Sequence, residues 1–193
     1  MANINKESLL TQEYVKELFD YKDGYLYWKV SKCYNGKTEV GKKAGWSSKT
    51  HSGYRNFVRV KGKTFIAARV IFFMHHNWWP EMVDHEDRNQ LNDRIENLRP
   101  ADGFQNAANV KKKDNKTSKY MGVHYALKIT RRKLKTTGEI KEWSNPKWVA
   151  QISHMNKRIS LGNYKTEIEA ALAYNKGAVK YHGEFANLNI VTL

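Results

Sequence analysis

Four polar side chains between positions 82 and 110 have the types and spacing needed to hydrolyse a phosphodiester. They are Asp84, His85, Asn97 and Asn106. The reaction needs an activated water, neutralisation of the phosphate charge and help for the leaving oxygen, and one divalent cation can supply the last two. One carboxylate plus one amide oxygen is an adequate protein contribution for Mg²⁺, and a neutral histidine is a suitable base near pH 7. The segment therefore predicts a metal-dependent phosphodiesterase site.

The charge of this segment is opposite to that of the chain. Positions 81–109 hold three Arg and no Lys against seven Asp and Glu, so 3 − 7 = −4, while the formal net charge of the 193-residue chain is +15. A negative centre in a cationic protein is typical of a cation site beside a phosphate. The alternative for its acids and amides is turn formation, because such side chains bond to their own backbone. We expect that role for Asp87, Asn89, Asn92 and Asp93.

Composition restricts the compartment and the partners. The net charge and a pI near 9.8 indicate a polyanionic partner, and the alternative is a basic surface that serves solubility alone. The longest apolar run, at 70–74, is too short to span a bilayer, and no lipidation signal, basic amphipathic helix or signal peptide is visible. Cys33 is the only cysteine, which excludes an intrachain disulfide and a thiolate-rich zinc site. We expect an intracellular protein with no membrane partner.

Hydrophobic periodicity and turn signals predict the elements that must position the four side chains. We expect a helix at 5–20 capped by Thr11, a strand at 25–30, a hairpin of 54–60 with 64–66, and a helix at 67–76 ended by Pro80. Around the four side chains we expect strands at 82–85 and 98–101 and a short helix at 103–110. Asp84 and His85, adjacent on a strand, would project to opposite faces.

A strongly basic stretch marks a change of domain. Positions 111–141 hold eleven Lys and Arg against two acids, so 11 − 2 = +9, and the stretch begins with nine residues of which none is apolar. This pattern predicts a linker at 111–119. The linker would join a domain at 1–110 to a second domain at 120–189.

The second domain has the pattern of three short strands followed by a helix. We expect strands at 120–126, 148–154 and 158–161, with an insertion at 127–146 between the first two. The helix would begin with a capping box of Thr166 and Glu169. Its apolar stripe would consist of Ile168, Ala171, Leu172, Ala178 and Val179 and would cover one face of the sheet. The predicted fold class is α+β, with a three-stranded antiparallel sheet packed on one helix in this domain.

The segment with the four polar side chains resembles the HNH nuclease family, in particular the homing-type endonucleases carried by phages and introns. The matching motifs are VDH at 83–85, the spacing of Asn89 and Asn92, ENLR at 96–99 and QNAAN at 105–109. The resemblance implies a ββα-metal motif in the N-terminal domain. Asp84 and Asn106 would hold one metal ion, His85 would be the general base, and Asn97 would brace the loop that orients His85.

At the three motif positions of the HNH family this chain has the letters H-N-N instead of H-N-H, because an asparagine stands at the third position. An oxygen ligand there favours Mg²⁺ or Mn²⁺ over zinc. The resemblance extends to positions 8–80, where phage members of the family often have a histidine at the place of Ala68. Arg69 is retained and is a candidate phosphate contact.

The C-terminal part resembles the plant ethylene-response-factor type of DNA-binding domain. The matching motifs are SKYMGV at 118–123, KWVAQI at 147–152, LGNY at 161–164, EAALAYN at 169–175 and GEFANLN at 183–189. That family lays its sheet in the DNA major groove, which implies DNA contacts at Met121, Gly122, His124, Gln151, Ser153, Arg158 and Ser160. Plant members have mostly Arg and Trp at these places, so their target sequence is not implied. In the insertion we expect phosphate contacts from Arg131, Arg132, Lys133 and Lys135.

Together these patterns predict a DNA endonuclease that depends on Mg²⁺ or Mn²⁺. The N-terminal domain would cut double-stranded DNA, and the C-terminal domain would select the site. One active site per chain and the lack of coiled-coil heptads favour a monomer, and the resemblance to phage proteins favours the host cytoplasm. The main alternative is a DNA-binding regulator with an inactive nuclease half, and an RNA-binding module is a third.

Overall fold

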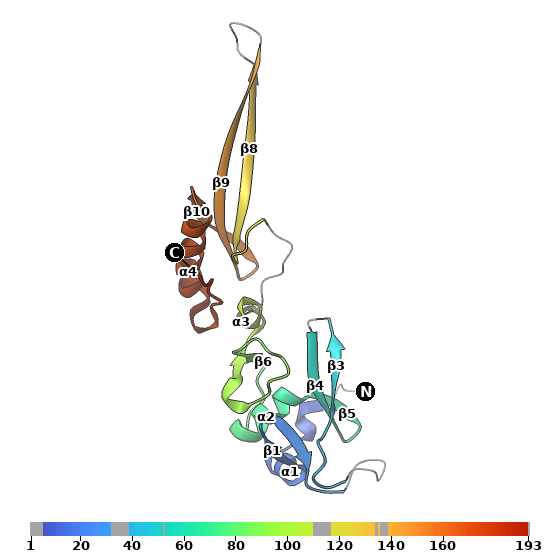
Figure 1. The fold of residues 1–193 in the computed structure, drawn as a ribbon. Helices are drawn as coiled ribbons and strands as arrows, with labels where there is room; N and C mark the ends of the chain where they lie inside the picture. The colour runs from blue at the N-terminus through green and yellow to red at the C-terminus, as the bar shows by residue number, and fades with distance from the viewer. Residues whose placement is uncertain are drawn as a thin grey trace. The chain divides into compact units, whose positions relative to one another are not determined.

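The computed structural model describes residues 6–31, 39–51, 53–109, 117–133, 135 and 139–192. It divides into two compact units, Met1–Asn106 and Ala107–Leu193, and each is described by itself (Figure 1). Both units combine helices with small antiparallel sheets, so the predicted α+β class is confirmed at that level. In the described part of the chain, no helix combines the length and apolar character needed to cross a membrane.

The first unit begins with two short helices and a two-stranded sheet. These elements are the 3-10 helix η1 (Lys6–Leu9), α1 (Gln12–Leu18), β1 (Phe19–Lys22) and β2 (Tyr25–Trp28). Thr11 caps α1 as expected, because its hydroxyl accepts a hydrogen bond from the Tyr14 N–H at 3.2 Å. The prediction of one helix over 5–20 is wrong, because Phe19 is extended and pairs with Trp28 across the turn at Asp23 and Gly24.

A three-stranded sheet and a helix follow; the predicted hairpin supplies two of the three strands, and the predicted helix is confirmed. The sheet consists of β3 (Trp46–Thr50), β4 (Gly53–Val60) and β5 (Lys63–Ile66) in the order β3-β4-β5, and α2 spans Ala67–His76. Helix α2 ends because Asn77 is left-handed, with φ 60°, and its N–H bonds to the Phe73 carbonyl at 2.9 Å. The helix therefore stops before Pro80, which is not its terminator.

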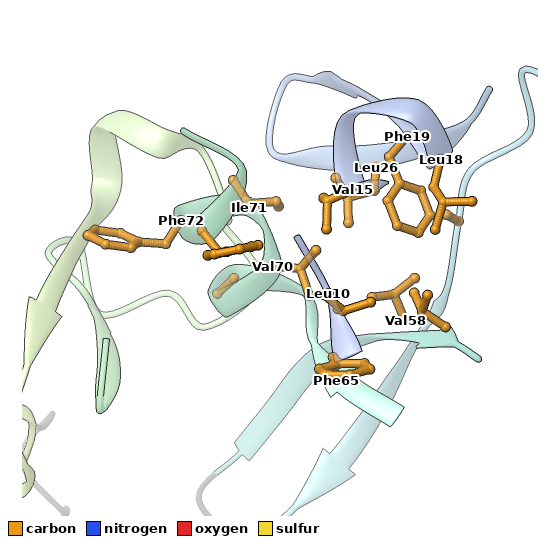
Figure 2. Close-up of a cluster of buried hydrophobic side chains, with 14 of the residues drawn as sticks. Leu10, Val15, Leu18, Phe19, Leu26, Val58, Phe65, Val70, Ile71 and Phe72 are labelled. Carbon is orange, nitrogen blue, oxygen red and sulfur yellow. The ribbon is translucent and has the colours of Figure 1, made fainter. Parts of the chain in front are cut away.

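The core of the first unit lies between α1, α2 and the two sheets. Val15, Phe19, Val70 and Ile71 are fully buried, and Val58 of β4 joins them (Figure 2). Burying side chains of this size stabilises the fold by roughly 1.5–3 kcal/mol each relative to exposure. This core fixes α2 in place, and α2 in turn contacts the strand that follows it.

The first unit closes with two strands and the start of a short helix, whose last two residues belong to the second unit. They are β6 (Met82–His85), the 3-10 helix η2 (Ile95–Asn97), β7 (Leu98–Ala101) and α3 (Gly103–Ala108). Strands β6 and β7 are antiparallel, with Asp84 opposite Arg99 and His85 opposite Leu98. Both predicted strands are confirmed. The helix ends at Ala108, and Val110 lies outside the described residues.

The second unit is a three-stranded antiparallel sheet with one helix. Its elements are β8 (Val123–Lys133), β9 (Ile140–His154), β10 (Lys157–Tyr164), α4 (Glu167–His182) and the 3-10 helix η3 (Gly183–Phe185), and the sheet order is β10-β9-β8. The predicted bounds of the first two strands, 120–126 and 148–154, are wrong, because β8 and β9 extend into the stretch 127–146 that the sequence predicts to be an insertion between them. Strands β8 and β9 pair without a shift from Val123 opposite Ala150 to Lys133 opposite Ile140, so this segment continues both strands.

Helix α4 covers one face of this sheet. The capping box of Thr166 and Glu169 is present as predicted. The predicted stripe is wrong in part, because Leu172 and Val179 are exposed. The buried face of the helix consists mainly of small residues, namely Ala170, Ala171, Tyr174, Gly177 and Ala178. Small side chains let the helix axis approach the sheet, and Tyr174 fills the remaining space.

The predicted linker lies only partly within the described residues, because 111–116 fall outside them. Ser118 is buried, and its hydroxyl donates to the Glu167 carboxylate of α4 at 2.6 Å. The Lys119 N–H donates to the same oxygen at 3.1 Å. Residues 118 and 119 are therefore bound to the second unit.

Candidate active site and nucleic-acid interface

Asp84 occupies a buried position on β6 and is paired across the sheet with an arginine. Its Oδ2 accepts hydrogen bonds from Nε and Nη2 of Arg99, at 2.9 and 2.8 Å. The Asp84 side chain is 5% exposed and that of Arg99 is 16% exposed. Charges this deep need a partner, and the antiparallel register supplies one by placing the two residues opposite each other. Arg99 closes the ENLR motif at 96–99, but the sequence assigns it no role, because its pairing with Asp84 depends on the register of the two strands.

His85 is buried beside Asp84 and bonds to a different carboxylate. Its Nε2 lies 2.7 Å from Oδ1 of Asp93, and Asp93 is 1% exposed. Oδ2 of Asp93 accepts from Nδ2 of Asn56 at 2.9 Å. The prediction that Asp93 only caps a turn is therefore wrong, because its bonds go to two buried side chains from β6 and β4.

Asn56 is the signal in the sequence that could have revealed this arrangement. It has the same strand parity as Val58 and Val60, which are core residues. A polar side chain at a core position must find hydrogen-bond partners. Asn56 therefore requires a buried polar partner elsewhere in the chain, and that partner is Asp93.

The hydrogen-bond chain determines which nitrogen of a neutral His85 carries the proton. Nδ2 of Asn56 also approaches the Leu91 carbonyl at 3.4 Å, and its Oδ1 accepts from the Ser47 hydroxyl at 2.6 Å. This amide orientation makes Asn56 the donor to Asp93. Because an ionised carboxylate only accepts, His85 must donate through Nε2. The lone pair of the neutral imidazole is then on Nδ1, which can accept a proton from water.

Asn97 braces the loop that follows His85, as the resemblance implies. Its Oδ1 accepts from the Asp87 N–H at 2.9 Å, and its Nδ2 donates to Asp87 Oδ1 at 3.0 Å and to the Asn92 carbonyl at 2.8 Å. Asp87 in turn accepts from the Asn89 N–H at 2.8 Å and from Asn92 Nδ2 at 2.7 Å. The predicted turn roles of Asp87 and Asn89 are confirmed, because their side chains accept from the Asn89 and Leu91 N–H groups, whereas the Asn92 side chain bonds to the Asp87 carboxylate.

These hydrogen bonds affect the ionisation of Asp87. Burial acts to raise the pKa of its carboxyl, but hydrogen bonds from Asn92, the Asn89 backbone and Asn97, together with nearby His85, lower the pKa below its ordinary value. A depressed pKa stabilises the fold at neutral pH, and this contribution is lost as the pH falls through that pKa.

We expect ¹³C NMR to show that the Asp87 carboxyl titrates below its ordinary range and that Asn92→Ala raises its pKa. An unchanged pKa in Asn92→Ala would contradict this origin.

Asn106, the second proposed metal ligand, lies on α3. Asp102 caps this helix by accepting hydrogen bonds from the Phe104 and Gln105 N–H groups, both at 2.8 Å. The Asn106 N–H bonds to the Asp102 carbonyl at 3.1 Å, and the residue is half-buried.

Arg69 on α2 is bound within the protein. Its Nη1 pairs with Glu7 at 2.5 Å, and its Nη2 donates to the Pro80 carbonyl at 2.6 Å. With His85 and Asp93 it lines a cavity of about 120 Å³. Its guanidinium thus links η1 to the segment just before β6. Its contact with a phosphate stays a prediction.

In the second unit, five of the seven predicted DNA-contact positions share one exposed face of the sheet. Alternation along β9 turns Ala150 and Ile152 toward α4, and it turns Gln151 and Ser153 away from the helix. The register places Ser160 opposite Gln151 and Arg158 opposite Ser153, and His124 of β8 lies opposite Val149 on the same face.

Met121 and Gly122 are not part of that face. Met121 packs against the core on the α4 side, and its backbone N–H donates to Asn189 Oδ1 at 2.6 Å. A Cβ added to Gly122 would lie 2.0 Å from Cδ2 of Tyr174, and its φ is +67°. The matches at these two positions are thus explained by packing against α4 and the C-terminal segment.

The basic residues of the predicted insertion lie along β8 or beyond its end. Arg131 forms an ion pair with Glu142 on β9, and Lys133 and Lys135 are exposed. The side chain of Arg132 lies outside the described residues.

No family model matches this chain, and no solved structure is significantly similar to it.

Proposed function

We propose that the chain is a metal-dependent endonuclease of the HNH homing type that hydrolyses DNA phosphodiester bonds. The observation that carries the proposal is the buried His85, whose Nε2 bonds to Asp93 at 2.7 Å next to the buried carboxylate of Asp84. Burying two carboxylates and an imidazole within ten residues of the chain costs stability. A catalytic site explains why a small domain keeps them.

Each side chain has a separate part in the proposed reaction. Nδ1 of His85 removes the proton from the attacking water. Asp93 holds the imidazole by Nε2 and stabilises the imidazolium that forms, as a carboxylate does in other histidine-based sites. Asn97 keeps the loop after His85 in place through its bonds to Asp87 and Asn92.

The residues present fit a hard divalent cation by the chemistry of their donors. Asp84 offers a buried carboxylate and Asn106 an amide oxygen, and both are ligands that Mg²⁺ and Mn²⁺ accept. When bound, the cation would neutralise charge on the phosphate and stabilise the leaving oxygen. One Asp and one Asn are fewer than the three His, Cys, Asp or Glu side chains typical of an all-protein metal site. Among the described residues no such group of three occurs.

The exposed sheet face of the second unit supports double-stranded DNA as the substrate. It presents His124, Gln151, Ser153, Arg158 and Ser160 on the side of the sheet opposite α4. The formal charge of +15 favours a polyanion. In this account the sheet selects the site and the first unit cuts.

One observation favours a second candidate, a DNA-binding regulator without nuclease activity. Arg99 occupies Oδ2 of Asp84 at 2.8 Å, and a cation would compete with that guanidinium. If the ion pair persisted, the site would bind no metal and the chain would bind DNA without cutting it.

Metal titration separates the two candidates. Calorimetry with Mn²⁺ should show one site in the wild type, with affinity at least roughly tenfold lower in Asp84→Asn and in Asn106→Ala. Asp84→Asn is preferable to alanine because it keeps a partner for Arg99. Glu96→Gln, an exposed acid on η2, is the matched control and should bind as the wild type does. Equal Mn²⁺ binding by all four proteins would rule out the proposed ligands.

A further inference from the structure

Strands β8 and β9 extend well past the part of the sheet that α4 covers. The core under the helix includes Val123 of β8 and Ala150 and Ile152 of β9, with Trp148 at its margin. Beyond these residues the two strands continue as a two-stranded ribbon, which consists of 125–133 and 140–147 (Figure 1). Isolated two-stranded hairpins are marginally stable in water. A ribbon of this length is therefore a candidate for binding a partner.

The ribbon has two chemically different faces. One face, which we call the apolar stripe, consists of Tyr125, Leu127 and Ile129 on β8, and all three side chains are exposed. It continues the side of the sheet on which α4 packs, because Tyr125 has the same parity as Val123 and its ring contacts Trp148.

The opposite face, which we call the lysine face, includes Lys141, Asn145 and Lys147 of β9. Every second residue of a strand lies on the same side, so these residues continue the row that leads to Gln151 and Ser153. Strand β9 pairs with β8 without a register shift over this whole length, so the row is not interrupted. Lys141 and Asn145 are exposed and Lys147 is half-buried. The lysine face is thus an extension of the sheet face proposed to contact DNA.

Charge decides between the two faces as the site for a polyanion. Among the alternate positions of β9 that form the lysine face, from 141 to 147, there are two Lys and no acidic residue. The other face has Lys133 and Arg131, but Arg131 forms an ion pair with Glu142 on that same face. Leucine and isoleucine gain nothing from phosphate, so the apolar stripe does not suit that partner. The lysine face therefore offers the better site for phosphate.

We propose that the lysine face lies along double-stranded DNA next to the site read by the sheet and that Lys141 and Lys147 contact backbone phosphates there. A two-stranded ribbon fits the major groove and its margins. The residues of β8 beyond Ala126 span about 23 Å, which corresponds to about seven base pairs of DNA. The ribbon thereby lengthens the footprint without adding base readout. This proposal rests on the proposed DNA binding by the second unit.

The test uses the full chain and two double variants of the same ribbon. Lys141→Gln with Lys147→Gln removes the charges of the lysine face, and Leu127→Thr with Ile129→Thr is the matched control on the apolar stripe. Threonine keeps the strand preference, and circular dichroism checks the fold of each variant. Affinity for one duplex is measured at several salt concentrations, and hydroxyl-radical footprints are recorded.

We expect the lysine variant to lower the slope of log K against log salt by about 1.8, since each phosphate contact contributes about 0.9. Its affinity should fall by at least about tenfold near 0.1 M salt, and its footprint should shorten at one end. The control should match the wild type in slope and footprint. An unchanged slope and footprint in the lysine variant would overturn the proposal, as would loss of binding in the control alone. If the wild type bound no duplex, the proposed DNA binding itself would fail.

Discussion

Replacing His85 by alanine is expected to lower DNA cleavage by about 10²- to 10⁴-fold, which is the typical contribution of a general base. DNA affinity should change little, because His85 belongs to the first unit and the proposed DNA-contact face lies in the second. The measurement is the single-turnover rate on supercoiled plasmid in Mg²⁺, with a gel-shift assay alongside.

Two further variants make the His85 result interpretable. The alanine variant leaves Asp93 buried with one partner fewer, which costs about 1–3 kcal/mol, so thermal unfolding must accompany the kinetics. His85→Gln keeps a hydrogen-bonding group beside Asp93 and should be equally inactive. His76→Ala, an exposed histidine on α2, should cut at the wild-type rate. Near-normal cleavage by either His85 variant would show that His85 is not the base.

Replacing Asp93 by asparagine is expected to lower the rate constant of cleavage by about 10²-fold or more while DNA affinity changes little. Asp93 accepts hydrogen bonds from both His85 and Asn56, and an asparagine has only one acceptor oxygen. If the amide nitrogen of the new asparagine faced His85, Nε2 of the imidazole would have to accept its hydrogen bond. The proton of the imidazole would then be on Nδ1, and Nδ1 could no longer take a proton from water. A comparable carboxylate-to-amide change in a serine-protease triad lowers the rate by about 10⁴.

A second substitution should restore the activity lost in Asp93→Asn. In the double variant Asp93→Asn with Asn56→Asp, the new carboxylate at position 56 can accept from the amide introduced at position 93 and from Ser47. The oxygen of that amide can then accept from Nε2 of His85 again. We expect the double variant to cleave at least about tenfold faster than Asp93→Asn, an effect that a purely structural role for Asp93 would not require. Full activity of the single variant would contradict the assigned tautomer.

Elements with local signals were predictable, and elements defined by distant pairing were not. The range of α2 and the capping box of Thr166 and Glu169 follow from residues within a few positions of one another. Phe19 continues the helical spacing of the residues before it, which predicts a helix there, but its partner Trp28 fixes it as a strand. The lengths of β8 and β9 depend on their pairing with each other, so no local signal in the sequence shows where the exposed ribbon begins or ends.

The site was predictable where a motif covers it and was missed where a contact between distant residues creates it. Asp84, His85 and Asn97 follow from the family resemblance. Asp93 lies in a segment rich in Asp and Asn, which predicts a turn residue, whereas its actual role depends on Asn56, 37 positions earlier. A buried polar residue on a core-facing strand position is the signal that short motifs do not contain.

A plasmid assay with the purified wild-type chain tests directly whether the protein is a metal-dependent endonuclease. Supercoiled plasmid is incubated with the protein in Mg²⁺ and, in parallel, in EDTA, and the product ends are mapped by run-off sequencing. If the protein is a metal-dependent endonuclease, the plasmid should be cut at a limited set of positions in Mg²⁺ and not in EDTA. Tight DNA binding without any cleavage in Mg²⁺, Mn²⁺ or Ni²⁺ would contradict it and would support the regulator instead.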